Sequence, residues 1–456
     1  MPKQPWIIEI RKIMHLAIPL IISNVAMISM EVIDTIMAGQ ASAEDLAGLA
    51  IGGNIWLFIE VGMGGLISAI TPRIARFHGA KQFKDITIET QQALLLGFVL
   101  GAIATVIMFL IIPFIPLLGA SEQVTLIAQG YTEVIAYSLI PSSVIWVLYC
   151  LLEGHGLLRF VVISSLVVVV LNLIFDYIFV FGKLGFPALG GIGCAWTTTT
   201  IYWLWAAACI LYVASHSDTK SYQIFAKWPT FDWQRWKAIF ALGLPISLAI
   251  LAEEGFFNVA TLLIAPLGTE QLGAHQITFQ VVALVLMFGL GIGQATAIVV
   301  ARSIGRSEIH RMIYHVRSGF GLVVSIGLVV GAFIFSFRNE LPNLFTQDAG
   351  IASISSAIMI LAPLYLLSDV LQIWAAQTLR GFEDTKIPMI IQIISYWAIG
   401  FPLGYSLGAT SFWGESYGVY GFWIGFLGGV FIGSCLLCTR LYLKAHNYHT
   451  KNQAAV

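Results

Sequence analysis

Long uninterrupted apolar runs are the feature that most constrains how this 456-residue chain folds. A helix needs about twenty consecutive apolar residues to cross a bilayer, whereas transmembrane β-strands alternate apolar and polar residues over about ten positions. The runs in this chain are long and continuous, so the sequence predicts an all-α polytopic membrane protein. We place twelve helical spans at about 13–37, 46–70, 92–115, 124–152, 160–181, 192–214, 236–264, 272–300, 318–337, 351–378, 387–407 and 419–443.

Composition excludes several other classes of protein. Only 10% of the residues are charged, against about a quarter in soluble domains. A net charge of −1 offers no basic face for nucleic acid. The five cysteines lie in or beside apolar runs without the paired spacing of a disulfide framework or a metal knuckle. The N-terminal residues lack a short apolar region with a cleavage site, so we keep the first run as a helix.

The distribution of Lys and Arg orients the spans. With the N-terminus inside, 21 of the 23 basic residues fall in inside segments, and Lys183 and Arg338 fall outside. This is a strong positive-inside bias, and a wrongly added helix would scramble it. We therefore expect both termini in the cytoplasm.

An internal repeat appears when the sequence is shifted by 226 residues. The repeat predicts two parallel, pseudosymmetric six-helix bundles; the alternative is one twelve-helix bundle with coincidental matches. We expect an N-lobe over 1–214, a cytoplasmic linker over 215–235 and a C-lobe over 236–456. The identities include Leu16 with Leu242, Pro19 with Pro245, Arg76 with Arg302 and Gly79 with Gly305.

Carboxylates within the spans are the candidate functional residues. An ionisable side chain at mid-membrane costs at least a few kcal/mol and normally faces a cavity or a partner. No Lys or Arg lies deep in any span, so a proton, Na⁺ or an organic cation is needed to neutralise these acids. This pattern favours cation transport over anion or lipid-diphosphate transport. The acids are Glu31, Asp34, Glu60, Glu133, Asp176, Glu253, Glu254 and Asp369.

Spacing groups some of these acids. Asn172 and Asp176 are four residues apart and so share one helix face, where an amide oxygen and a carboxylate can point at one small cation or at Asp34. Glu253 and Asp369 form a possible second cluster, with Tyr365 one turn from Asp369.

Other residues are secondary candidates. Glu31 and Glu254 lie beside stronger candidates, and His275 is either a proton carrier or a hydrogen-bonded core histidine. Glu60 and Glu133 are equally compatible with an interfacial position. For every acid the alternative is a buried hydrogen bond to a neighbouring helix.

Proline in the first span permits a kink. Pro19 removes a backbone hydrogen bond fifteen residues before Asp34. Neutralising that carboxylate is therefore expected to bend the helix.

Three stretches resemble the multidrug and toxic compound extrusion (MATE) family, in particular its NorM-like bacterial branch: VIDTIMAGQASAEDLAGLAIGGNIW, LLIAPLGTEQLGAHQI and SDVLQIWAAQTLRGFEDTKIPM. The resemblance covers essentially the whole chain. It implies a multi-pass antiporter of the bacterial inner membrane that exports cationic or amphipathic drugs in exchange for Na⁺ or H⁺, and so contributes to antibiotic resistance. We expect a monomer surrounded by membrane lipid, with no cofactor beyond the coupling ion and no nucleic-acid partner.

The resemblance also assigns site residues. Asp34 resembles the family's first-helix carboxylate, Glu253 and Asp369 resemble its C-lobe cation-site acids, and Tyr365 matches an adjacent tyrosine.

Asn172 and Asp176 resemble the N-lobe amide and carboxylate of the family's other prokaryotic branch. NorM-like members commonly carry an amide where this chain has Asp176. This departure leaves open whether Na⁺ would bind at Glu253 and Asp369 or at Asp34 and Asp176, and whether Na⁺ or H⁺ dominates coupling.

Three other functions are alternatives. A lipid-linked oligosaccharide flippase can share this architecture, but it would want intramembrane Arg or Lys. An integral membrane enzyme would need a nucleophile with a base, or His-rich metal spacing, and the sequence suggests neither. A channel is less compatible, because nothing resembles a selectivity filter.

Overall fold

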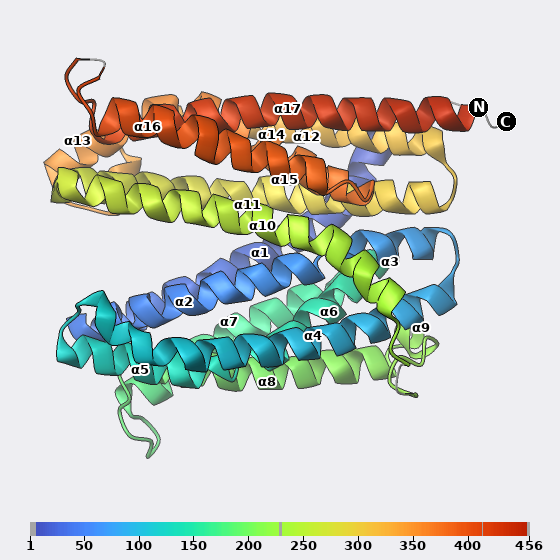
Figure 1. The fold of residues 1–456 in the computed structure, drawn as a ribbon, viewed down its shortest axis with the longest axis horizontal. Coiled ribbons are helices and arrows are strands. Elements are labelled where there is room, and N and C mark those ends of the chain that lie inside the picture. Colours follow the sequence, from blue (N-terminus) through green and yellow to red (C-terminus); the bar gives the residue numbers. More distant parts are fainter. Residues whose placement is uncertain (1–5, 228–229, 413, 454–456) are drawn as a thin grey trace. The chain divides into compact units, whose positions relative to one another are not determined.

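The computed structural model of this chain describes residues 6–227, 230–412 and 414–453. In this part of the chain every regular element is a helix (Figure 1). Eleven helices are long and apolar enough to cross a membrane, and the number is twelve when the bent pair α5 and α6 counts as one span. The prediction of an all-α polytopic membrane protein is thus confirmed.

The chain forms two compact units. The N-unit runs from Ile22 to Ser247, and the C-unit combines the residues up to Ile21 with those from Leu248 onward. Helices α1 (Trp6–Ala41) and α10 (Trp233–Ile264) are each divided by a unit boundary, so that one segment of the helix belongs to each unit.

The remaining elements belong to one unit each. The N-unit contains α2 (Ala43–Ile67), α3 (Ile70–Gly79), α4 (Phe83–Ile111), the 3₁₀ helix η1 (Ile112–Leu118), α5 (Glu122–Ala136), α6 (Leu139–His155), α7 (Leu158–Phe181), α8 (Gly191–Ser215) and α9 (Ser217–Lys220). The C-unit contains η2 (Ala265–Leu267), α11 (Thr269–Gly305), α12 (Ile309–Ser336), η3 (Leu341–Leu344), α13 (Ala349–Ile358), η4 (Met359–Leu361), α14 (Ala362–Gly381), α15 (Lys386–Ile393), the π-helix η5 (Ile394–Gly400), α16 (Phe401–Gly408) and α17 (Val419–Gln453).

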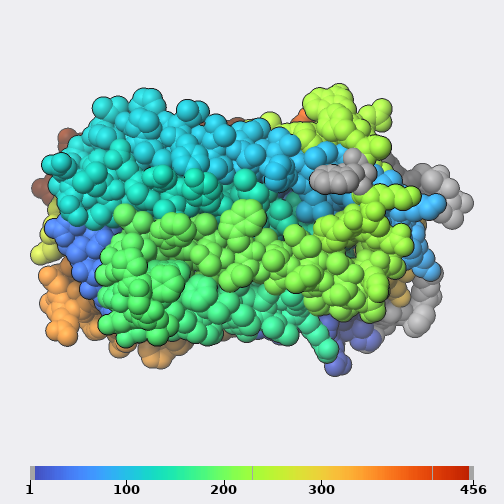
Figure 2. Space-filling model, turned by 90° about the horizontal axis from the view of Figure 1, so that it is seen from below, coloured from blue at the N-terminus to red at the C-terminus, as the bar shows by residue number. Residues whose placement is uncertain are grey.

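Apolar side chains cover the outer surface of the N-unit. Figure 2 shows a face on which α7 and α8, in green, lie beside α4 and α5, in teal. Leu110, Ile163 and Leu211 on these helices are 65%, 60% and 68% exposed. Such a surface is unfavourable in water and suits contact with lipid tails.

The unit boundaries differ from the expected lobes 1–214 and 236–456 in the first segments of α1 and α10. In the N-unit, a Cβ at Gly243 of α10 would lie 2.2 Å from the backbone oxygen of Leu66, so only glycine permits this close approach. Ser247 Oγ donates to the Gly62 oxygen at 2.7 Å. In the C-unit, Gly291 packs in the same way against Ile21. Each segment therefore joins a unit through helix contacts that apolar periodicity does not reveal.

The 226-residue repeat is visible in the local structure of each unit. The two boundaries, after Ile21 and after Ser247, are 226 residues apart. The same offset relates three further pairs: the first residues of α2 and α11 (Ala43 and Thr269), the first residues of α4 and α12 (Phe83 and Ile309), and the left-handed turn residues Lys81 (φ 59°) and Ser307 (φ 58°). Positions 226 apart can therefore be compared directly.

Two spans are less regular than the sequence suggests. The span expected at 124–152 is bent by 47° between α5 and α6. The span expected at 387–407 contains the π-helix η5. Pro402, at the start of α16, has no N–H to offer the carbonyl four residues earlier, which explains the local change of hydrogen-bond pattern.

An ion-pair network fixes the start of α10 within the N-unit. Glu89 is 0% exposed and accepts hydrogen bonds from Arg73 Nη2 at 3.1 Å and from Arg235 Nη1 at 3.1 Å. Arg235 Nη2 also donates to Asp85 Oδ1 at 2.7 Å. Asp232 is a weaker partner, because its Oδ2 lies 3.6 Å from Arg235 Nε and its side chain is 41% exposed.

We expect Glu89→Gln to lower the stability of the protein. The change leaves two arginines without their shared buried counter-charge, at a cost of about 3 kcal/mol. Thermal unfolding of the purified protein in detergent measures the effect. Asp232→Asn is the matched control and should change stability by at most about 1 kcal/mol; equal losses in the two variants would contradict the assigned role of Glu89.

Candidate functional site

Two helices of the N-unit, α1 and α7, bring Asp34, Asn172 and Asp176 together, as the sequence predicts. Asp34 lies on α1, and Asn172 and Asp176 lie one turn apart on α7. Asn172 Nδ2 donates to Asp34 Oδ1 at 2.8 Å, and Thr198 Oγ1 on α8 donates to Asp34 Oδ2 at 3.3 Å. Each oxygen of Asp34 therefore has one neutral donor.

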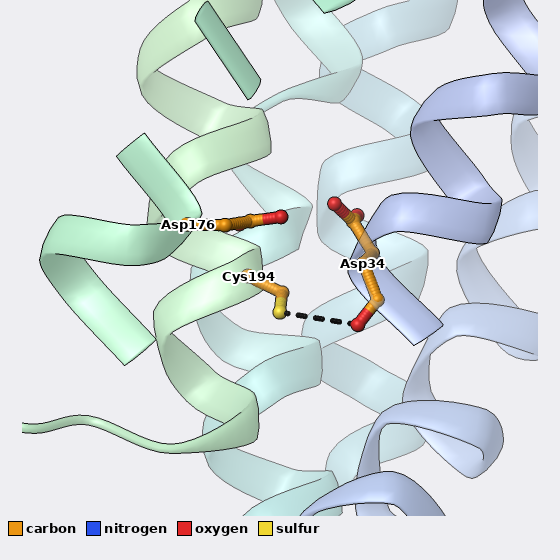
Figure 3. Close-up of side chains that lie close together, drawn as sticks. All are labelled: Asp34, Asp176 and Cys194. Atoms are coloured by element: carbon orange, nitrogen blue, oxygen red, sulfur yellow. Dashed lines mark hydrogen bonds between the residues drawn. The ribbon is translucent and has the colours of Figure 1, made fainter. Parts of the chain in front are cut away.

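Asp176 is the less satisfied carboxylate of this pair. Its side chain is 0% exposed, and Asp34, Thr197 and Cys194 are its polar neighbours, but neither of its oxygens has a partner at ordinary hydrogen-bond geometry among the described residues. Figure 3 shows that Asp176 and Cys194 point toward Asp34 from the facing helices. An ionised carboxylate buried in this way is costly unless a cation or a proton accompanies it.

Cys194 completes a group of potential ligands. Its Sγ donates to the backbone oxygen of Asp34 at 3.6 Å (Figure 3). One ligand atom each from Asp34, Asp176 and Cys194 lie within 4.8 Å of one another. These three residues, called the N-unit cluster below, have a spacing that one cation can bridge.

A cavity of about 220 Å³ reaches the N-unit cluster. It gives access to Asp34 and Thr198, and Glu31 also lines it. No Lys or Arg lies among the residues that line the cavity. The other lining side chains are mostly apolar or aromatic and include Met27, Met30, Trp56, Tyr131 and Tyr202.

The C-unit holds a second group of acids, and Tyr365 is part of it. Asp369 on α14 is 1% exposed, interacts electrostatically with Glu253 on α10, and approaches the hydroxyl of Tyr365. Tyr396, within η5, interacts with Glu253 and accepts a hydrogen bond from Gln372 Nε2 at 2.6 Å. The structure thus brings together the three residues predicted here.

Arg380 corrects one expectation for the C-unit. The sequence suggested that these acids have no basic neighbour, but Glu253 interacts electrostatically with Arg380 near the end of α14. Arg380 lies at the end of the observed span Ala349–Arg380, two residues beyond the expected end at 378. In the described N-unit cluster no such base is present.

The secondary candidates have separate environments. His275 is 1% exposed and its Nε2 is 3.0 Å from Thr261 Oγ1, among the rings of Phe279, Trp423 and Phe426. These contacts are those of a hydrogen-bonded core histidine. Glu254 is half-buried next to Glu253 and interacts with it electrostatically.

Glu60 and Glu133 differ from each other. Glu60 is 5% exposed and accepts hydrogen bonds from Trp146 Nε1 at 2.7 Å and Ser142 Oγ at 3.0 Å. Glu133 is exposed on the surface of α5. A buried hydrogen-bonded role fits Glu60, and an interfacial one fits Glu133.

Sequence reasoning missed Thr198 and Cys194 as parts of the site. The signal lay in the segment CAWTTTT, because Cys194 and Thr198 are one helical turn apart in an otherwise apolar span. It also missed Tyr396 and Gln372, whose contribution depends on the packing of η5 against its neighbours.

Comparisons with known proteins place the chain among membrane transporters. The family described as MatE matches residues 19–178 and 245–406. The chain is 31% identical over 427 residues to "Probable multidrug resistance protein NorM" of Halalkalibacterium halodurans, covering 93% of this chain and 92% of that protein. It is 30% identical to "Multidrug resistance protein PmpM" of Pseudomonas aeruginosa, covering 96% and 92%.

Solved structures support the fold. The Vibrio cholerae MATE transporter VcmN in its bent form has a TM-score of 0.84 at 21% identity and covers 97% of this chain and 98% of its own. An outward-facing multidrug resistance MATE transporter has a TM-score of 0.88 at 20% identity and covers 97% of both chains.

We expect Cd²⁺ to stabilise this protein by binding the N-unit cluster. Cd²⁺ is a soft divalent cation that prefers thiolate ligands, and a ligand at one hundred times its Kd stabilises the folded state by about 2.7 kcal/mol. Thermal unfolding with and without Cd²⁺ measures the shift. Cys194→Ala should abolish it and Cys209→Ala, a buried thiol elsewhere on α8, should retain it; the reverse result would show that Cd²⁺ binds elsewhere.

Proposed function

This chain belongs to the multidrug and toxic compound extrusion family, and we propose that it exports cationic or amphipathic drugs across the bacterial inner membrane in exchange for H⁺ or Na⁺. The observation that carries the proposal is Asp176, a buried carboxylate whose oxygens have no partner at ordinary hydrogen-bond geometry among the described residues and which faces Asp34. The described groups that can donate hydrogen bonds to these two buried acids are all neutral, so a mobile cation or a proton has to supply the compensating positive charge.

Competition between the drug and the ion for Asp34 couples drug export to ion import. The cavity exposes Asp34 and is lined by aromatic and methionine side chains, which suit flat lipophilic cations. When H⁺ or Na⁺ neutralises the acids, a cationic drug loses its electrostatic partner and leaves. When the ion departs on the cytoplasmic side, the carboxylates attract drug again.

The size of the cavity supports a conformational change in this cycle. Sites for drug-sized ligands usually measure about 300–1,000 Å³, and the cavity at Asp34 measures about 220 Å³. Helix α1 is suited to transmit the change because it carries Asp34 in the N-unit and a segment of the C-unit, with Pro19 two residues before the boundary. We therefore propose alternating access in which neutralisation of Asp34 alters α1.

The energy available is sufficient for accumulation. One charge moving across 100 mV yields about 2.3 kcal/mol, and about 1.4 kcal/mol corresponds to a tenfold concentration ratio. Inward movement of one cation can thus drive a modest outward gradient of drug.

Transport of cations fits the site better than the other functions. A flippase for lipid-linked diphosphates would need basic side chains at its substrate, and the described cavity lining contains none. The proposed cycle breaks no covalent bond, so it is transport without an enzymatic step.

We expect Asp34→Asn and Asp369→Asn to lower drug efflux by at least about tenfold, equivalent to about 1.4 kcal/mol. An amide keeps the shape of the carboxylate but cannot bind or release the coupling charge. Ethidium or norfloxacin efflux from energised cells measures the loss, with Glu133→Gln as an exposed control that should pump normally. Wild-type rates in either Asp variant would refute the scheme.

Separate ion gradients should identify the coupling ion. In proteoliposomes, we expect an imposed Na⁺ or pH gradient to drive drug transport, because either cation can neutralise the acids. If both gradients work and Asp176→Asn abolishes one response, the two groups of acids couple to different ions. Transport driven by neither gradient would exclude exchange as the mechanism.

A further inference from the structure

A strongly basic pocket lies in the C-unit, apart from both groups of acids. It measures about 470 Å³ and is formed where α1 begins, α11 ends and α12 begins. Buried Leu16, Val299 and Ser303 form part of its wall. The basic side chains that line it are Arg11, Lys12, His15, Arg302, Arg306 and Arg311.

Acidic side chains neutralise only part of this charge. Glu9 Oε1 is 2.8 Å from Lys12 Nζ, and its Oε2 is 3.0 Å from His315 Nδ1. Glu308 pairs with Arg311 at 2.8 Å. Lys12 and Arg311 are thus each paired with one acid.

Arg11, Lys12 and Arg306 are exposed cations of the pocket, and of these Lys12 is paired with Glu9. Neither Arg11 nor Arg306 has an ion-pair partner in the described part of the chain. Both guanidinium groups are therefore available to an external anion.

The equivalent place in the N-unit carries its own anions. Under the 226-residue offset, His315 corresponds to Glu89 and Arg311 to Asp85. These two carboxylates hold Arg235 at 3.1 and 2.7 Å. Arg235 itself corresponds to Glu9.

The helix contact is thus retained in both units with its charges reversed. In the N-unit the carboxylates come from α4 and neutralise the bases around them, whereas in the C-unit α12 supplies further bases. The same backbone turn, with Lys81 and Ser307 both left-handed, supports each arrangement. The helix contact in the C-unit lacks the α4-type carboxylates that balance the bases in the N-unit, and an external anion can supply this negative charge.

We propose that this pocket binds the phosphate group of an anionic phospholipid. Arginine forks match phosphate oxygens in the way that Arg73 and Arg235 match the carboxylate of Glu89. Basic pockets between transmembrane helices are suited to anionic head groups. This inference does not depend on the proposed exchange mechanism, because it concerns neither group of acids.

The surroundings favour a lipid over free phosphate. The pocket lies at the ends of three helices of membrane-spanning length, and the ends of such helices are expected near lipid head groups. Trp6, Ile7 and Ile8 on the first turn of α1 are 55%, 76% and 41% exposed, and Ile8 lines the pocket. Exposed apolar side chains beside a cationic site suit an amphiphile with an acyl chain.

Calorimetric titration of the purified full chain in detergent tests the proposal, with short-chain phosphatidylglycerol, short-chain phosphatidylcholine and sodium phosphate as probes. We expect phosphatidylglycerol to bind with one site and at least about tenfold more tightly than the other two, since each basic residue near an anionic head group contributes about 1 kcal/mol. Arg11→Gln combined with Arg306→Gln should weaken it by at least about tenfold. Lys237→Gln, at the N-unit position equivalent to Arg11, is the matched control and should bind normally.

A second variant guards against simple misfolding. Arg11→Glu combined with Arg306→Glu reverses the two exposed charges that have no ion-pair partner among the described residues, so the protein should unfold at the wild-type temperature and phosphatidylglycerol binding should be lost. Equal affinity for phosphatidylcholine, or wild-type affinity in either multiple variant, would overturn the proposal. Phosphate binding as tightly as phosphatidylglycerol would overturn the lipid assignment in favour of free phosphate.

Discussion

An ionised side chain in an apolar bilayer needs a compensating charge nearby, and this requirement organises the structure. At the helix ends the requirement is met within the protein, where buried Glu89 binds Arg73 and Arg235. In the N-unit cluster no charge of the described residues meets it, because Asp34 has only the neutral donors Asn172 and Thr198. The first arrangement stabilises a fixed helix contact, and the second leaves a place for a mobile cation.

Duplication explains why one scaffold carries both arrangements. Helix starts, the left-handed turn and the unit boundaries all repeat at an offset of 226 residues, so backbone geometry is shared. Charged residues are not shared: Asp34 corresponds to Ala260, and Glu89 corresponds to His315. Because a surface or cavity charge can change without altering helix packing, the two copies can take different ligands on the same frame.

The sequence was sufficient to predict what depends on local pattern. Continuous apolar runs gave the spans, and the four-residue spacing of Asn172 and Asp176 placed both side chains beside Asp34 as expected. It was insufficient where contacts between distant segments decide. Apolar periodicity does not reveal that the first segment of α1 packs in the C-unit, nor that Arg380 comes within electrostatic range of Glu253. The sequence places Cys194 in or beside an apolar run, but the direction of its side chain toward Asp34 depends on how α8 packs against α1.

Helix α1 connects the features that duplication separated. It begins in the C-unit with Glu9 beside the basic pocket, passes the unit boundary after Ile21, and presents Asp34 in the N-unit. A ligand shifts a conformational equilibrium only by its difference in affinity for the two states. Helix α1 carries both contacts. If an anion bound at the start of α1 changes the free energy of neutralising Asp34, then neutralising Asp34 changes the free energy of anion binding by the same amount.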